Sequence, residues 1–256
     1  MVSLPLSHLE NRMRNIFLLV VMLCSLPRLA APADMDCTLL EKKRWEQVYP
    51  DAQFDPTACK CKRIPDDTTQ AIVVAGTWLA IGDVSTGEVL SDGGEINMDA
   101  TGFSIDTARY WVAPGVRAFG IRGGVAPYHQ YSEQSVDQLN LYVRKGERIV
   151  PILEKLITQD ADDGVTVNGC TDPNTCTGKM SDFKRSIEVM KTATNGYFDF
   201  AVVETSRHCE GAETREACKK SETWRHELKR TYTLRYDGTT YGITTALPPR
   251  VMLFEQ

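Results

Sequence analysis

The chain has 256 residues, of which 42% are hydrophobic and 25% are charged, with 18 glycines and 12 prolines. This ordinary globular composition argues against a disordered chain, a collagen-like repeat and a protein with many membrane spans. The formal net charge of −5 lacks the basic excess that is typical of nucleic-acid binding, so we expect no nucleic-acid partner. The length fits one large domain or two small ones.

The N-terminus has the three parts of a secretory signal peptide. Arg12 and Arg14 precede an apolar run from Ile16 to Leu26, and Ala31-Pro32-Ala33 supplies a small-residue cleavage triplet. The run is well short of the ~20 residues that span a bilayer, so we expect cleavage rather than a membrane anchor. We therefore predict a signal peptide over residues 1–33 and a periplasmic or secreted protein with no transmembrane span after cleavage.

Two variations on this leader stay open. Met13 as the start would give a more compact leader. Cys24 invites lipid attachment, but Met22 and Leu23 before it are not the small residues that a lipoprotein signal requires. Cleavage after Ala33 leaves 223 residues with 26 basic and 33 acidic side chains, a net charge of −7. We expect such a protein to be soluble, to repel anionic surfaces and to favour a cationic partner weakly.

The cysteines that follow the leader fall into three local groups, which in an oxidising compartment predict local disulfides. Cys170 with Cys176, and Cys209 with Cys218, would each close a short loop. In the first group Cys37 can pair with Cys59 or with Cys61. The remaining cysteine of that group would be a reactive thiol, an inert thiol, or bonded to another chain. The disulfide candidates are Cys37, Cys59, Cys61, Cys170, Cys176, Cys209 and Cys218.

A zinc site is the alternative for the third cysteine group. His208, Cys209, Cys218 and His226 are suitable ligands within 19 positions. Their spacing matches none of the common finger patterns, in which ligands come in close pairs. We therefore favour the disulfide and expect no metal and no other cofactor.

A short amphipathic helix is predicted over 36–49. Asp36 is a suitable N-cap, and Pro50 ends the helix. Its apolar stripe is predicted to consist of Leu40, Trp45, Val48 and Tyr49.

From Ala71 onward the pattern changes to short apolar strands separated by turn formers. The segment 160–178 is polar and rich in Asp, Asn and Gly, which predicts a long loop. The predicted turns and breaks are Ser85-Thr86-Gly87, Gly93-Gly94, Ala113-Pro114-Gly115, Lys145-Gly146, Asn195-Gly196 and Asp237-Gly238, the last followed by a return strand through 241–245.

This pattern predicts a mainly β fold: antiparallel hairpins in a sandwich or irregular propeller-like arrangement, with a short N-terminal helix and local disulfides. No linker divides the chain after the leader. We expect a signal peptide over 1–33, an N-terminal helical, cysteine-containing cap over 34–66, and one β-rich domain over 67–256.

Several stretches resemble hairpins of exported bacterial β-rich proteins of uncharacterised function, which have propeller-like or sandwich folds. The resemblance covers less than a fifth of the chain, supports the export and β interpretations, and implies no catalytic residue. The stretches are Asp106–Tyr110, Ala113–Gly120, Leu141–Gly146, Gly196–Phe200 and Arg235–Gly238.

Catalytic motifs are incomplete. Ser181-Asp182-Phe183-Lys184 fits the S-x-x-K pair of penicillin-binding enzymes, but the S-D-N and K-T-G elements of that family are missing. No G-x-S-x-G, H-E-x-x-H or P-loop motif is present. The carboxylates of 160–164 lack the spacing of a calcium-binding EF-hand. We therefore assign no catalytic residue.

The best candidate binding residues are Tyr128, His129 and Tyr131, in a polar connection after Gly123-Gly124. Aromatic side chains with polar neighbours on a loop are typical of contact with a partner, and His129 could also act as a base.

The leading hypothesis is an exported, non-enzymatic protein that binds another macromolecule, for example an inhibitor or immunity protein against an envelope-acting enzyme or toxin. One alternative is an envelope hydrolase with a carboxylate or His site that leaves no local motif, since folding can bring two carboxylates together. The other is a structural envelope component. The sequence does not determine the oligomeric state.

Overall fold

The computed structural model describes residues 34–35, 37, 42–50, 59–98, 100, 102–125, 128–129, 132–162, 178–212 and 225–243. All of them belong to one compact unit, Asp34–Gln256. The predicted signal peptide lies outside the described residues. Within the part of the chain that is described, no helix has the length and apolarity of a membrane span.

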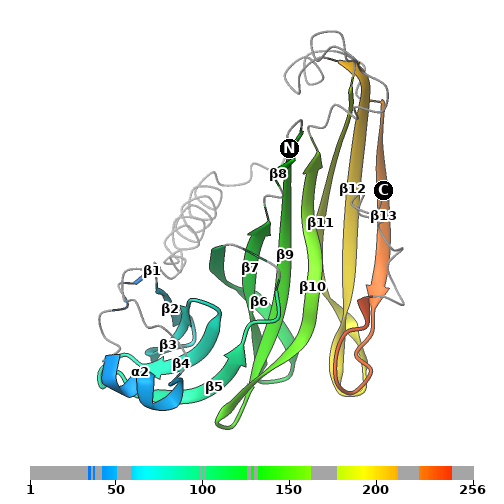
Figure 1. Ribbon diagram of the computed structural model, residues 1–256. Coiled ribbons are helices and arrows are strands. Elements are labelled where there is room, and N and C mark those ends of the chain that lie inside the picture. Colours follow the sequence, from blue (N-terminus) through cyan, green and yellow to red (C-terminus); the bar gives the residue numbers. More distant parts are fainter. Residues whose placement is uncertain are drawn as a thin grey trace, which may run out of the picture. The chain divides into compact units, whose positions relative to one another are not determined.

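The described residues are mainly β, as predicted, with one short α-helix, α2 (Lys42–Val48), near the N-terminus (Figure 1). The strands are β1 (Asp34–Met35), β2 (Lys60–Ile64), β3 (Asp67–Ala75), β4 (Trp78–Asp83), β5 (Val89–Glu95), β6 (Gly102–Ala113), β7 (Val116–Val125), β8 (Tyr128–His129), β9 (Ser132–Lys145), β10 (Arg148–Asp162), β11 (Gly178–Thr194), β12 (Tyr197–Ala212) and β13 (Arg225–Leu234).

Strand β10 is the branch point of the sheet. One of its edges pairs antiparallel with β9 along the whole strand. Its other edge is shared, because β5 pairs with it at Arg148 and β11 pairs with it from Gln159 onward. From these contacts the sheet continues in three directions: through β5 to β4, β3, β2 and β1; through β11 to β12 and β13; and through β9 to β7 and β6.

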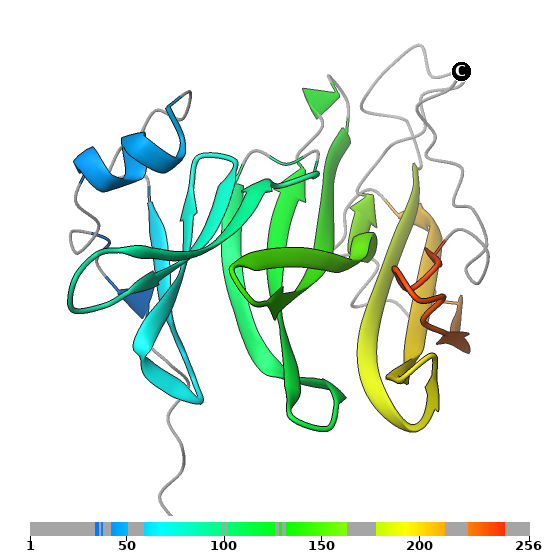
Figure 2. The same ribbon diagram turned by 90° about the horizontal axis from the view of Figure 1, so that it is seen from below.

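The two ends of the sheet cover opposite faces of its middle (Figure 2). On β9, Leu139 and Leu141 point to one face and Asn140 and Tyr142 to the other, and all four are buried. The first face packs with residues of β10, β12 and β13, among them Phe200. The second packs with residues of β3, β4, β6 and β7. We call β6, β7, β9 and β10 the central wall.

The predicted sandwich or propeller-like arrangement is therefore not confirmed. The strands form one branched sheet, in which the antiparallel hairpins predicted from the turns are joined through the shared edge of β10. The parallel contact between β5 and β10 is the exception to the antiparallel pattern.

Helix α2 packs on the outer face of β3 and β4. Trp45 is fully buried there, together with Tyr49 just after the helix, against residues such as Val73 and Ala80. The Tyr49 hydroxyl donates to Asp92 Oδ1 at 2.5 Å, which ties this end of the helix to β5. The side chains between the helix and strands β2–β4 thus form a further buried layer.

The predicted helix is correct in kind but differs in detail. It spans Lys42–Val48, shorter than 36–49, and it ends two residues before Pro50. Val48 was predicted to join the apolar stripe, but its side chain is 43% exposed, since the buried face is set by Trp45 and Tyr49 four residues apart. Asp36 and Leu40 lie outside the described residues.

Four predicted turns join paired strands as expected: Ser85-Thr86-Gly87, Ala113-Pro114-Gly115, Lys145-Gly146 and Asn195-Gly196. In the last of these, Asn195 and Gly196 have φ of 50° and 84°. Positive φ at both central residues is what a two-residue type I′ hairpin turn requires, and Asn-Gly is among the dipeptides that favour it.

The predicted break at Gly93-Gly94 is wrong, because both glycines lie within β5. A Cβ on Gly93 would lie 2.9 Å from Leu79 Cγ, and Gly94 has a φ of 65°. The register between β4 and β5 shifts at Leu79. The two glycines therefore form a bulge that lets β5 approach β4, rather than ending the strand.

Two other boundaries also differ from the prediction. The predicted loop 160–178 is shortened, because β10 continues to Asp162; residues 163–177 lie outside the described residues. The turn at Asp237-Gly238 is present, but the described part of its return is a single bridge between Tyr236 and Tyr241. The Tyr241 N–H donates at 2.7 Å to the Ile152 carbonyl, on the stretch of the β10 edge between β5 and β11.

A buried asparagine fixes an irregular stretch of β10. Asn140 is fully buried on β9, and its Oδ1 accepts the N–H of Lys155 at 2.6 Å. Lys155 has a φ of 54°, and the β9–β10 register shifts on both sides of it. The Asn140 Nδ2 donates to the Asn97 carbonyl and to the Tyr142 hydroxyl, each at 3.1 Å. One side chain thus accepts a backbone hydrogen bond from the irregular stretch of β10 and ties β9 to the segment after β5.

We predict that Asn140→Ala lowers the free energy of unfolding by about 1–3 kcal/mol, because it removes the part-buried hydrogen bonds that the Asn140 amide forms with the Lys155 N–H and the Asn97 carbonyl. Asn97→Ala is the matched control, since the Asn97 side chain is exposed and its carbonyl would remain; its expected effect is within about 0.5 kcal/mol. Urea unfolding of the two variants measures both values. Equal effects would show that Asn140 has no special role.

Candidate functional site

The sequence-predicted binding residues are only partly placed. Tyr128 and His129 form β8, whose backbone pairs with Glu133 and Ser132 at the start of β9. Tyr131 lies outside the described residues. β8 and the start of β9 thus form a short antiparallel pair. The role of Tyr128 and His129 in binding stays a prediction.

The cysteines of the second and third groups are largely outside the description. Cys170, Cys176 and Cys218 fall on residues that are not described. Cys209 lies on β12, where its Cα partner is Met180 of β11. The disulfides predicted for these groups therefore stay predictions.

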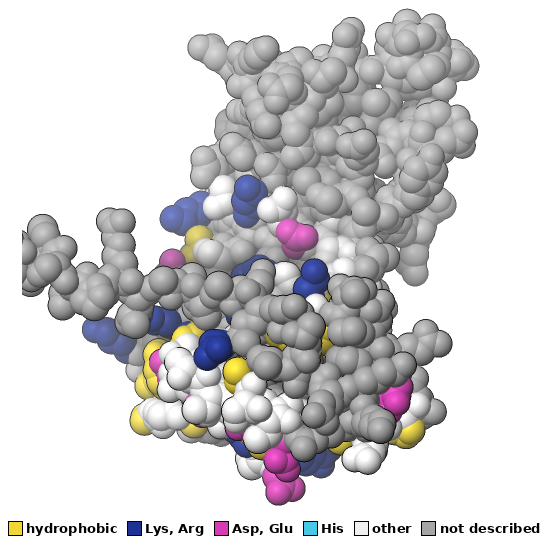
Figure 3. Space-filling view, turned by 90° about the vertical axis from the view of Figure 1, so that its left-hand side faces the viewer, with side chains coloured by type: hydrophobic (Ala, Val, Ile, Leu, Met, Phe, Trp, Pro, Cys, Tyr) yellow, Lys and Arg dark blue, Asp and Glu magenta, His cyan; other side chains and the backbone are white. Residues whose placement is uncertain are grey.

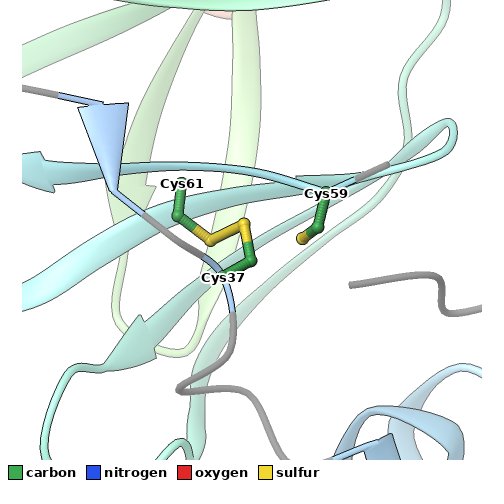
Figure 4. Close-up of side chains that lie close together, drawn as sticks. All are labelled: Cys37, Cys59 and Cys61. Atoms are coloured by element: carbon green, nitrogen blue, oxygen red, sulfur yellow. A yellow bond between two sulfur atoms is a disulfide. The ribbon is translucent and has the colours of Figure 1, made fainter. Parts of the chain in front are cut away.

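The first cysteine group is brought together (Figure 4). Cys37 and Cys61 form a disulfide with a Cα–Cα distance of 5.5 Å, one of the two pairings left open by the sequence. Cys59 lies on the same face of the chain as Cys61, since residues two apart on an extended strand point the same way. The three Sγ atoms lie within 4.8 Å of one another, and all three side chains are buried. Closing the loop of 24 residues contributes about 3 kcal/mol to stability in the chain-entropy model.

A second candidate site is an exposed aromatic residue at the end of the β6–β7 hairpin. Trp111 of β6 faces Arg117 of β7 as a cross-strand pair, two residues from each end of the turn. The Trp111 side chain is 40% exposed, which is unusual for tryptophan. The Arg117 guanidinium lies over the indole ring, 5.9 Å from its centroid, in a cation–π contact.

The arginine that supports this ring is held from several directions. Arg117 is 13% exposed and forms an ion pair with Asp66, in the turn between β2 and β3. Its Nη2 also donates at 2.7 Å to the carbonyl of Thr107, in the irregular part of β6. The guanidinium plane is thus fixed against two strand pairs. We call Trp111, Arg117 and Asp66 the Trp111 platform.

A polar cluster lies on the opposite face of the same hairpin. Arg122 Nε and Nη2 each donate to Asp106 Oδ2 at 2.8 Å, and the Tyr110 hydroxyl donates to the same oxygen at 2.9 Å. Arg122 also donates to Thr158 Oγ1 on β10. Burial, and then the negative charge of Asp106, raise the pKa of Tyr110 to about 12. These contacts hold the bulge of β6 against β7 and β10.

A buried ion pair joins β11 to β12. Arg185 and Glu204 are 5% and 8% exposed, and two guanidinium nitrogens donate to Glu204 Oε2, at 2.9 and 2.7 Å. Arg185 also donates to the Ile157 carbonyl of β10. Arg185 and Glu204 therefore link β10, β11 and β12, and we assign them a structural role.

The Trp111 platform was not identified from the sequence. The sequence does contain the information that pairs Trp111 with Arg117. The two residues flank the predicted turn Ala113-Pro114-Gly115 at equal distances and therefore face each other across a hairpin. The exposure of Trp111 and the ion pair with Asp66 depend on distant segments, and no local pattern contains them.

Comparisons with known protein families, with curated proteins and with solved structures find no match to this chain.

We predict that Tyr110 stabilises the fold below about pH 10 and that this contribution is lost as pH rises toward 12. Its pKa is raised in the folded state, so the neutral hydroxyl is the form that favours folding. Tyr110→Phe should therefore lower the free energy of unfolding at pH 8, and its deficit relative to the parent should shrink by pH 11.5. Chemical unfolding at a series of pH values measures this difference. A deficit that stays constant would show that the hydroxyl is not coupled to folding.

Proposed function

We propose that the protein is an exported, non-enzymatic protein that binds another protein of the cell envelope, and that the Trp111 platform is its contact surface. An inhibitor or neutraliser of an envelope-acting enzyme or toxin is the function of this kind that we favour. The observation that carries the proposal is an exposed tryptophan held in place by a fixed arginine.

The composition of the platform supports binding. Tryptophan and arginine are the side chains most enriched among residues that dominate the energy of protein interfaces. Trp111 carries a large apolar surface, of which 40% is exposed and would be desolvated by a partner. The contacts of Arg117 with Asp66 and Thr107 are formed in the unbound protein. Because the platform is already ordered, a partner pays less conformational entropy on binding it.

The edge of β6 near the platform favours side-chain contact over strand addition. The Ile105 carbonyl accepts a hydrogen bond from Lys62 Nζ at 3.2 Å, and the Thr107 carbonyl accepts one from Arg117. These carbonyls are engaged by side chains of this protein. A bulge between Asp106 and Tyr110 further distorts the edge, as edges protected from strand pairing commonly are.

The surface charge supports a partner that is recognised by shape and apolar contact. On the face shown in Figure 3, Lys, Arg, Asp and Glu side chains are interspersed with hydrophobic and other ones. Mixed charge gives little long-range attraction, and Asp66 neutralises Arg117 within the platform. The net charge of −7 that remains after removal of the proposed leader adds a weak preference for a cationic partner.

We predict that Trp111→Ala weakens the complex with the partner by about 30-fold, the loss typical of a dominant interface residue. A photo-crosslinking amino acid at position 111, used in envelope extract of the native host, identifies the partner by mass spectrometry. Calorimetry with the purified partner then compares the parent with Trp111→Ala.

Val48→Ala is the matched control, because Val48 is a similarly exposed large hydrophobic residue, at 43%, on α2. We expect it to change the dissociation constant less than about threefold. Crosslinking at position 48 should not yield the adduct obtained at position 111. An identical adduct at both positions, or equal affinity of Trp111→Ala and the parent, would contradict the assignment of the contact surface.

A further inference from the structure

Three sulfur atoms from two segments meet in the apolar layer beneath α2. Cys37, Cys59 and Cys61 are 2%, 7% and 5% exposed, and their Sγ atoms lie within 4.8 Å of one another. They belong to the same buried cluster as Trp45 and Tyr49. A disulfide and a third cysteine therefore share one enclosed space (Figure 4).

The pairing of β1 with β2 relates Cys37 to both other cysteines. The register sets Asp34 opposite Lys62 and Met35 opposite Cys61. Continued by two residues, this antiparallel register would set Cys37 opposite Cys59. Directly opposite residues have Cβ atoms about 4.5–5.5 Å apart, close enough for a cross-strand bond. The disulfide present in the structure, Cys37–Cys61, is the diagonal pairing instead.

We propose that the three cysteines form an internal thiol–disulfide exchange site, in which Cys37 alternates between Cys61 and Cys59. The Cys59 thiol releases its proton, and the thiolate attacks Cys37 Sγ. A Cys37–Cys59 bond forms as the Cys37–Cys61 bond breaks, and Cys61 leaves as a thiolate that takes up a proton. One disulfide and one thiol are present before and after, so no oxidant or reductant is consumed.

The burial of the cluster determines which thiols take part. The three cysteines are nearly inaccessible to a thiol from solvent, whereas the Cys59 Sγ already lies within 4.8 Å of the other two sulfur atoms. Attack within a preformed site has a high effective concentration. Exchange is therefore intramolecular, and because the thiolate is the nucleophile its rate rises with pH.

Exchange would also move an attachment point of the N-terminal segment. The tether of Cys37 shifts by two residues, from Cys61 on β2 to Cys59 just before that strand, about 7 Å along an extended chain. In the Cys37–Cys59 form the bond joins directly opposite residues and would extend the pairing of β1 with β2. The two forms thus differ in how far the segment that begins at Asp34 is held to the sheet.

The experiment maps the thiol in the native, oxidised protein. The protein is incubated at pH 8, quenched in acid, unfolded in acid and labelled with N-ethylmaleimide. Lys60 lies between Cys59 and Cys61, so cleavage after Lys60 separates the two cysteines for mass spectrometry. We expect the label on both Cys59 and Cys61 and none on Cys37. Label confined to Cys59 after incubation under native conditions would overturn the proposal.

Two variants separate this exchange from scrambling by other thiols. In Cys59→Ala the attacking sulfur is absent, so Cys61 should carry no label; label there would show that another thiol is responsible and would contradict the proposal. In Cys61→Ala we expect a Cys37–Cys59 disulfide. Both variants are oxidised under the same conditions, in which Cys59→Ala forms its Cys37–Cys61 disulfide. If Cys37 and Cys59 of Cys61→Ala then both carry the label, the Cys37–Cys59 pairing is not accessible and the proposal is wrong.

Discussion

The outer edge of β10 is divided between two parts of the sheet, and the remaining architecture depends on this division. β5 uses the edge at Arg148, and β11 uses it from Gln159 onward. Between them the strand is irregular at Lys155, where Asn140 supplies the hydrogen bond that the ladder lacks. In this protein the two continuations pack on opposite faces of the central wall. The central wall consequently becomes buried on both sides.

Burial on both faces explains where the candidate sites lie. The wall itself is filled with apolar residues and contains polar groups that are engaged with one another, such as Asp106 with Arg122. The surfaces that remain for a partner are at the ends of hairpins. The Trp111 platform lies at such an end, where Asp66 of the β2–β3 turn reaches Arg117 of β7. The cysteine cluster lies in the outer layer, where β2 meets α2 and the N-terminal segment.

Local chemistry in the sequence predicted the features that depend on a few adjacent residues. The Asn195-Gly196 turn is an example, because its positive φ values favour this dipeptide over most others. The mainly β class followed from many such turns. The partner of Cys37 was narrowed to two cysteines, and the choice between them depended on the register of β1 with β2, which the sequence does not contain.

Features that depend on distant contacts could not be predicted in the same way. Gly93 was predicted to break the chain, but in the structure Leu79 occupies the space that a side chain at position 93 would need. Val48 fits an apolar helical stripe, but the packing of Trp45 and Tyr49 leaves it exposed. The exposure of Trp111 depends on how far the rest of the sheet covers the hairpin, which no local pattern contains. The branch at β10 joins segments more than 50 residues apart.

Amide hydrogen exchange tests most directly whether the central wall is enclosed by the two ends of the sheet. β9 is paired on both edges and buried on both faces, whereas β13 pairs with β12 as the last strand of its branch. We expect the amides of 139–143 to exchange at the slowest rate in the protein, through global unfolding, and those of 229–233 to exchange much faster through local opening. Equally fast exchange in the two segments would contradict a wall that is covered on both sides.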